Sequence, residues 1–277
     1  MIDLIAARNF VYANGAMWEK ALFAHLFEDG PIDRLYACLL CYKNKDGGWG
    51  HGLEHDVKCL SSTPIALEFL LTVLRDTGIA PGPILDKTPQ WVEQNTNPEG
   101  TLRNPPDLTK YPCADWQKYG HEFPLSIVGN LNKHGFATEA ILRSAHEWAK
   151  SNLTLDAIAE NEWLFMAYRA FDYYMNTEDA DNIDGLRKAT VENIDACALR
   201  HEKNGQHNKL FPLFQFVTGP DSNLIQRLSD SLVDRVLDYL ETAQRDDGGW
   251  DDEHGLKHWQ PYFSTVILLA LRRFGRA

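Results

Sequence analysis

The chain has 277 residues, of which 24% are charged and 44% are apolar, the composition of a globular rather than a disordered protein. Its 27 Lys and Arg residues against 39 Asp and Glu residues leave a net charge of −12, which argues against a phosphate-binding surface and a nucleic-acid partner. No apolar run approaches the roughly 20 residues of a membrane helix. The N-terminal MIDLIAARNF lacks the basic stretch and apolar core of a secretion signal. We therefore expect a cytoplasmic protein with no integral membrane segment.

Helical periodicity dominates the chain. Taken in chain order, it predicts helices at residues 16–29, 32–42, 63–75, 138–150, 156–175, 180–199, 223–244 and 262–273, with weaker candidates near 83–94 and 122–133. The connections 95–121 and 200–222 are long, and long loops in compact domains are often functional. No shift in composition marks a linker, so we expect one domain that covers residues 1–277.

Two distant segments share one plan. Residues 35–50 (LYACLLCYKNKDGGWG) and 236–251 (VLDYLETAQRDDGGWD) each place an amphipathic helix before Asp-Gly-Gly-Trp. A polar loop follows each DGGW, and then Ser-Thr and an apolar helix. This pattern predicts hairpins with a polar outer helix, a tight turn and a buried inner helix. At roughly 45 residues per hairpin the chain has room for about six, which predicts an all-α, two-layered ring of about five to six hairpins.

The second segment carries the spacing of a known motif. An aromatic-Leu pair, a Gln and Gly-x-Trp stand at Tyr239, Leu240, Gln244, Gly248 and Trp250. This is the QW motif of squalene and oxidosqualene cyclases. The first copy keeps Leu39, Gly47 and Trp49 but has Cys38 and Lys43 in place of the aromatic residue and the Gln.

The chain thus resembles the terpenoid cyclase and protein prenyltransferase superfamily. Three stretches, residues 21–31, 45–71 and 219–250, are similar to a group of bacterial proteins that have QW-like repeats. The resemblance implies an α/α toroid with a central cavity and a cyclase-like activity, an isomerase or a lyase. The chain lacks the DxDD acid of class II cyclases and the DDxxD run that binds diphosphate through magnesium. Any cyclase-like chemistry therefore needs a different acid.

The loop GHGLEHD at residues 50–56 is the preferred source of that chemistry. It holds four ionisable side chains between an outer and an inner helix, which in a toroid is the mouth of the cavity. We predict that His51, Glu54 and Asp56 are catalytic acid–base groups. The structural alternative is that His51 and Glu54 cap helix ends and that Asp56 pairs with an arginine.

Closure of the ring would bring the corresponding loop of the last repeat, residues 251–259, opposite the first. Asp252 is therefore a fourth predicted catalytic residue. Aromatic and imidazole side chains are predicted to form the substrate-binding surface, with core packing as the alternative role. They are Trp49, Trp116, His121, Trp163, Tyr168 and Trp259.

No metal or cofactor is assigned. The resemblance to prenyltransferases suggests a zinc alternative at Asp56, Cys59 and His258, but the spacing differs from Asp-x-Cys and a Cys before an apolar helix is usually core. On an apolar inner helix, Glu68 needs a buried partner, because an unpaired buried charge is costly.

The function that these patterns favour is an enzyme that acts by acid–base chemistry on a small or isoprenoid-like molecule. One alternative is a carbohydrate-active hydrolase or lyase of the α/α-barrel type. The hydrolase would pair Glu54 or Asp56 with Asp252 or Asp115. Another alternative is a non-enzymatic module that binds a ligand or a peptide. The oligomeric state is left open.

Overall fold

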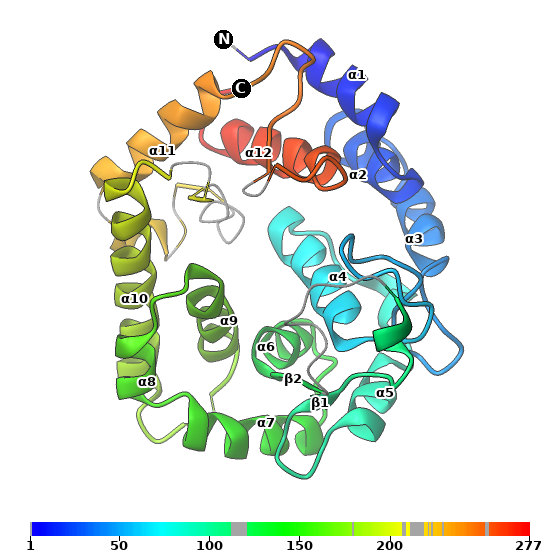
Figure 1. The fold of residues 1–277 in the computed structure, drawn as a ribbon, viewed down its shortest axis with the longest axis vertical. Helices are drawn as coiled ribbons and strands as arrows, with labels where there is room; N and C mark the ends of the chain where they lie inside the picture. The colour runs from blue at the N-terminus through cyan, green and yellow to red at the C-terminus, as the bar shows by residue number, and fades with distance from the viewer. Residues whose placement is uncertain are drawn as a thin grey trace. The chain divides into compact units, whose positions relative to one another are not determined.

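The computed structural model describes residues 2–111, 121–178, 180–206, 209–210, 219–220, 222, 224–228, 230–252 and 255–277. In these ranges the chain forms twelve α-helices and one short antiparallel strand pair, which confirms the all-α expectation (Figure 1). None of the described helices is long and apolar enough to cross a membrane.

The chain divides into two compact units, which we describe separately. Unit 1 consists of Met1–Cys41, Arg75–Gly78 and Ala198–Ala277, and unit 2 of Tyr42–Leu74 and Ile79–Cys197.

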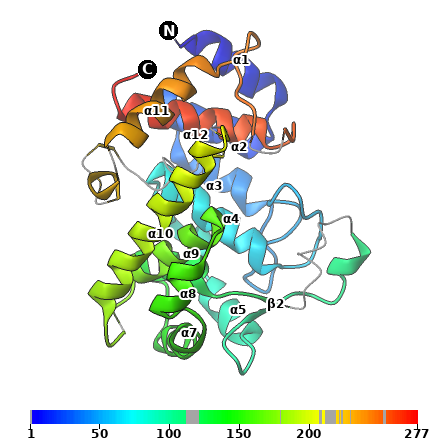
Figure 2. The ribbon, with the colours of Figure 1, turned by 60° about the vertical axis from the view of Figure 1, so that its left-hand side comes forward.

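Unit 1 is built around the apolar helix α12. Its helices are α1 (Leu4–Asn14), α2 (Met17–Phe27), α3 (Ile32–Leu40), α11 (Asp230–Thr242) and α12 (Gln260–Arg273), with a short 3-10 helix at Ile225–Arg227. Helix α12 packs against α1, α2 and α11, and α2 packs against α3 (Figures 1 and 2). Nearly every residue of α12 up to Leu271 is buried, as expected for an inner helix.

Unit 2 contains the remaining elements. They are α4 (Pro64–Thr77), α5 (Thr88–Asn95), β1 (Leu102–Arg103), β2 (His121–Glu122), α6 (Leu125–Lys133), α7 (Glu139–Asn152), α8 (Leu155–Glu160), α9 (Leu164–Met175) and α10 (Ile183–Lys203), with 3-10 helices at Gly82–Leu85 and Leu108–Lys110. The last turns of α4 and α10 belong to unit 1. Helices α6 and α9 lie side by side (Figure 1). Gly129 permits this approach, because a Cβ there would lie 2.3 Å from the carbonyl oxygen of Asp172.

The observed helices depart from the predicted ones in four places. The weaker candidate near 83–94 is divided into the 3-10 helix at Gly82–Leu85 and α5, and Lys87 between them has a φ of +65°. The predicted helix at 156–175 is interrupted, because the Asn161 side chain bonds both the N–H and the carbonyl oxygen of Trp163 and so competes with the helical ladder. Helix α11 begins only at Asp230. Helix α1 was not predicted, although the Asp3 carboxylate caps it by accepting the N–H of Ala6.

The two DGGW turns have the same backbone structure. In each, the residue two before the Asp exchanges two backbone hydrogen bonds with the Gly pair, and the Asp carboxylate accepts the N–H of the second Gly. The bonded pairs are Asn44–Gly48, Gly47–Asn44 and Gly48–Asp46 in the first turn and Arg245–Gly249, Gly248–Arg245 and Gly249–Asp247 in the second. The first Gly of each pair has a φ of +93° or +90°, which strongly favours Gly. The sequence repeat is therefore also a structural repeat.

A helix lies directly behind each turn. A Cβ on Gly47 would lie 2.3 Å from the carbonyl oxygen of Lys87, which is the residue before α5. In the same way, a Cβ on Gly248 would lie 2.3 Å from the carbonyl oxygen of Ala6 in α1. The second Gly of each pair meets an aromatic ring four residues further along its helix, Trp91 or Phe10.

The position of the QW glutamine has the same role in both copies. Gln244 accepts the N–H of Asp3 through Oε1 and donates to its carbonyl oxygen through Nε2, at 2.8 and 3.0 Å. Lys43 stands in place of the glutamine, and its Nζ donates to the carbonyl oxygens of Ile84 and Asp86, just before α5. Helix α1 therefore stands behind the second turn as α5 stands behind the first.

This tie predicts how Lys43 responds to substitution. Lys43→Met leaves two carbonyl oxygens without their donor and is expected to lower the free energy of unfolding by about 1–3 kcal/mol. Lys43→Gln keeps one donor and is expected to cost less than half as much. Urea unfolding measures both, and the exposed Lys45→Met is the control. Equal stability of the Lys43→Met and Lys45→Met variants would mean that the hydrogen bonds from Lys43 to Ile84 and Asp86 do not stabilise the fold.

Unit 2 has a buried polar cluster that includes Glu68. The Arg169 guanidinium donates two hydrogen bonds to the Glu68 carboxylate, one of them at 2.7 Å, and the Ser126 hydroxyl donates to the same group. Beside it, Asn130 donates to the Asp172 carboxylate at 3.1 Å. These contacts supply the partner that a buried Glu68 requires, and they join α4, α6 and α9.

Unit 1 has a separate polar cluster around Asp76, in the last turn of α4. The Asp76 carboxylate pairs with Arg75 at 2.7 Å and accepts the Tyr262 hydroxyl of α12 at 2.8 Å. Arg273 donates to the Asp76 carbonyl oxygen at 2.6 Å. Burial of the phenol, followed by the nearby Asp76 charge, raises the pKa of Tyr262 well above its usual value. The cluster thus fixes the last turn of α4 to α12.

Candidate functional site

The two loops that follow the DGGW turns differ in structure and in length. In the first, Thr63 N–H donates to the Trp49 carbonyl oxygen at 2.8 Å. In the second, the Ser264 hydroxyl accepts the N–H of Trp250 at 2.9 Å, at the equivalent position. Helix α12 begins at Gln260, whereas α4 begins only at Pro64, five positions later in the repeat. The first loop, residues 50–62, therefore replaces helix with irregular structure, which is where binding and catalytic groups tend to lie.

Glu54 is the buried acid of the first loop. Only 6% of the residue is exposed, and its Oε2 accepts the N–H of Asp56 at 3.0 Å. Burial, and next the negative charge of Asp56, raises the pKa of Glu54 from 4.5 to about 8. Two backbone hydrogen bonds, from Asp56 and Val57, oppose this rise and do not cancel it. Glu54 is therefore mainly protonated at neutral pH and is able to donate a proton.

The other groups of the first loop flank Glu54 in sequence. His55 is 8% exposed and its ring lies 5.8 Å from that of Phe69, while Asp56 is half-buried. Cys59 is fully buried, and its thiol points to Asp107 Oδ1 at 4.0 Å. Asp107 also accepts the Ser61 hydroxyl at 2.8 Å. A carboxylate from outside the loop thus holds its second half.

His51 lies at the exposed start of the loop. Its backbone has a φ of +57°, in the left-handed region that is unusual for a residue other than Gly. Its Nε2 lies 2.9 Å from Oδ1 of Asn44, which belongs to the first DGGW turn. Strained residues persist where surrounding contacts impose them, and such residues are concentrated at functional sites.

Asp252, the fourth predicted catalytic residue, belongs to unit 1 and occupies the position of His51 in the repeat. It is 2% exposed, and its Oδ1 accepts the N–H of Leu256. Its carboxylate therefore shapes the described part of the second loop. His258, named in the zinc alternative, also lies in unit 1, whereas Asp56 and Cys59 lie in unit 2. Among the residues that the structure describes, no group of three or more His, Cys, Asp or Glu side chains has a metal-binding arrangement.

The predicted substrate-binding residues have contrasting exposures. Trp49 is fully buried, and its indole N–H donates to Thr88 Oγ1 at 3.2 Å. Tyr168 is 6% exposed, whereas Trp163, directly before α9, is 72% exposed. Trp259 is half-buried and stacks on Phe263 with ring centroids 5.5 Å apart. Trp116 lies outside the described residues, and of His121 only the backbone in β2 is described.

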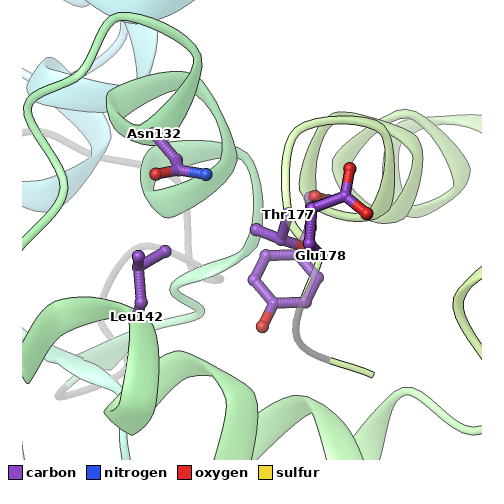
Figure 3. Close-up of a pocket in the computed structure, with 5 residues that line it drawn as sticks. Asn132, Leu142, Thr177 and Glu178 are labelled. Atoms are coloured by element: carbon purple, nitrogen blue, oxygen red, sulfur yellow. The ribbon is translucent and has the colours of Figure 1, made fainter. Parts of the chain in front are cut away.

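A small cavity of about 240 Å³ lies elsewhere in unit 2. Side chains from α6, α7, the end of α9 and the segment after it line it (Figure 3). They are Asn132, Leu142, Tyr173, Thr177 and Glu178. None of the predicted site residues lines this cavity. Arg187 pairs with Glu178 at 2.8 Å, so the carboxylate at its edge is already partnered.

The first loop also involves residues that sequence reasoning missed. Asn44 bonds His51, and its amide nitrogen also lies 3.0 Å from both the Leu60 carbonyl oxygen and Ser62 Oγ. No motif marks Asn44 because it differs from Arg245, its counterpart in the repeat. That difference was the available signal. Where the rest of a repeated turn is the same, a polar residue found in one copy alone suggests a role specific to that copy.

The first loop thus combines a buried neutral carboxyl, a second carboxylate and an exposed imidazole held by an amide, a set suited to acid–base chemistry. Comparisons with protein families, with curated proteins and with solved structures find no match for this chain. The function is therefore inferred from the geometry of the chain itself.

Proposed function

We propose that the chain is an enzyme with a terpenoid cyclase-like α/α toroid, which acts by acid–base chemistry on a small or isoprenoid-like molecule. The repeated turns support the fold, because α1 takes behind the second turn the place that α5 takes behind the first. In a chain that closes into a ring, the first helix must follow the last hairpin in this way. The Gln244 contacts with Asp3 support the same arrangement.

The observation that carries the activity is the buried carboxyl of Glu54. A class II cyclase starts its reaction by protonating an alkene or an epoxide, and this requires a carboxylic acid that stays protonated at neutral pH. With its pKa raised to about 8, Glu54 meets that requirement without a DxDD sequence. In this proposal Glu54 is the general acid, and His51 accepts a proton from the substrate.

The substrate class rests on two observations. Aromatic faces stabilise the cations that form when a polyene is protonated, and Trp163 and Phe165 are 72% and 52% exposed. The Arg169 guanidinium lies 4.3 Å from the centre of the Phe165 ring, so this ring already binds one cation through its face. The resemblance of Tyr239–Trp250 to the QW motif adds to this choice.

Glu54→Gln tests the proposal. The variant keeps the shape of the protonated side chain but removes its acidic proton, so turnover is expected to fall at least about a hundredfold with the fold intact. The purified chain is incubated with squalene, oxidosqualene and prenyl alcohols and diphosphates, and products are identified by gas chromatography and mass spectrometry. Glu147→Gln removes an exposed carboxylate from the same unit and is expected to leave turnover unchanged.

The possible outcomes separate the alternatives. Turnover that survives Glu54→Gln would exclude Glu54 as the acid. Release of reducing sugar from glycans, with no isoprenoid product, would favour the carbohydrate-active hydrolase. Ligand binding without turnover by either variant would favour the non-enzymatic module.

A further inference from the structure

The Asn44 side chain contacts three residues of the first loop. Its amide nitrogen lies 3.0 Å from the Leu60 carbonyl oxygen and 3.0 Å from Ser62 Oγ, and its Oδ1 lies 2.9 Å from His51 Nε2. The Ser62 hydroxyl in turn lies 2.8 Å from Asp46 Oδ1. These contacts run from an exposed imidazole to a carboxylate within one turn and its loop.

The partners determine which way the amide points. A carbonyl oxygen only accepts, so the Leu60 contact requires a donor from Asn44. The single Ser62 hydroxyl hydrogen is used on Asp46, so Ser62 Oγ also accepts from Asn44. Both hydrogens of the amide nitrogen are therefore used, and the atom that faces His51 is the amide oxygen.

An amide oxygen is an acceptor only, so His51 Nε2 carries a hydrogen. In a neutral imidazole the lone pair then lies on Nδ1. His51 is exposed, and Nδ1 makes no hydrogen bond to any residue that the structure describes. We infer that Asn44 is a positioning residue, which fixes His51 as the Nε2–H tautomer and leaves Nδ1 as the atom that accepts the substrate proton. The catalytic part of this inference rests on the proposed function.

The second repeat provides an internal comparison. Arg245 takes the position of Asn44 and pairs with Asp247 and Asp251, while Asp252 and Phe263 take the positions of His51 and Ser62. The backbone of the turn is nevertheless the same. The Asn44 contacts are thus not needed to build a DGGW turn. They belong to the first loop, where the amide nitrogen holds Leu60 and Ser62 and the amide oxygen holds His51.

The proton transfer is simple to balance. Nδ1 forms an N–H bond with a substrate proton, and the electron pair of the broken substrate bond stays with the substrate. The imidazolium keeps Nε2–H on the Asn44 oxygen, and it later returns the Nδ1 proton to solvent. Asn44 neither gains nor loses a proton.

Nitrogen-15 NMR of the His51 side chain tests the inference on the full chain, at a pH where the imidazole is neutral. A His51→Gln spectrum assigns the signals. We expect Nε2 of the native chain to appear protonated and Nδ1 unprotonated. In Asn44→Ala the ratio of the two tautomers is expected to fall about fivefold or more, the loss of one hydrogen bond. Asn44→Asp keeps an acceptor and is expected to keep the tautomer.

The control is Asn95→Ala, which removes an amide bonded to the Trp91 carbonyl oxygen in the same unit. A native spectrum with protonated Nδ1, or a tautomer ratio unchanged in Asn44→Ala, would overturn the inference. If Asn44→Ala does not fold, the native spectrum still tests the inference, because a protonated Nδ1 would contradict the inferred tautomer.

The NMR result does not depend on any substrate, so a failure of the proposed function is distinguishable from a failure of this inference. With a substrate in hand, a positioning role lowers kcat more than it raises KM in Asn44→Ala, and Asn44→Asp restores part of kcat. An unchanged kcat with the native tautomer lost would confirm the geometry and exclude the catalytic role of His51.

Discussion

The Glu54→Gln variant is expected to be more stable than the native chain at pH 8 and above, by on the order of 4–5 kcal/mol. The pKa of Glu54 is about 8 in the folded chain against 4.5 for the free side chain. Because the folded state holds this proton more tightly than the unfolded state, native stability falls as pH rises from about 4.5 to about 8. Glutamine has no charge to bury, so the variant does not share this loss.

The measurement is urea unfolding of both proteins at several pH values. Other titrating groups affect both proteins alike, so the difference between them isolates Glu54. It is expected to be small below pH 4.5, to increase up to about pH 8 and to be constant above. The exposed Glu147→Gln is expected to show no such rise. A difference that does not change with pH would mean that Glu54 is already ionised at neutral pH, and the general-acid proposal would fail with it.

The repeat itself could be predicted from the sequence because its signal is local. Asp, two glycines and Trp, in that order, specify a turn with one positive φ, a carboxylate cap and a buried indole, and both turns have these features. Apolar periodicity located most helices for a similar reason. Helix α1 was missed because its apolar residues are only weakly gathered on one face. Its clearest sequence signal is the N-terminal cap at Asp3.

The candidate site could be predicted only in part. The cluster of ionisable residues drew attention to His51, Glu54 and Asp56, but sequence alone does not reveal that Glu54 is buried, and burial is the main cause of its raised pKa. Asn44 was missed because its importance depends on contacts with Leu60 and Ser62, which lie well along the chain. The difference between Asn44 and Arg245 marks the position in the sequence, but it does not reveal which residues Asn44 contacts.

The lysine at position 43 shows the converse case. The sequence marks it as a departure from the QW motif, yet Lys43 makes the same kind of tie to backbone oxygens that Gln244 makes. Two different side chains perform one structural task because the task needs only a donor of the right length. A difference between the two copies of the repeat therefore indicates a different task only where, as at Asn44 and Arg245, the contacts also differ.

Gly248→Ala is expected to be the most damaging of the single substitutions considered, at a cost on the order of 3–5 kcal/mol. The residue has a φ of +90°, and a Cβ there would lie 2.1 Å from the carbonyl carbon of Ala6. The backbone strain at position 248 and the displacement of α1 therefore both lower the free energy of unfolding. Gly275→Ala provides the matched control, because it also has a positive φ, of +69°, but no described atom lies within 4 Å of its Cβ.

The control is expected to cost only about 1–2 kcal/mol, the strain alone, so the excess in Gly248→Ala measures how firmly α1 docks on the second turn. Hydrogen exchange adds a local test, since amides of Leu4–Asn14 should exchange faster in Gly248→Ala than in Gly275→Ala. Equal losses of stability in the two variants would mean that the turn does not hold α1. The equivalence of α1 and α5, which supports the proposed toroid, would then lose its main evidence.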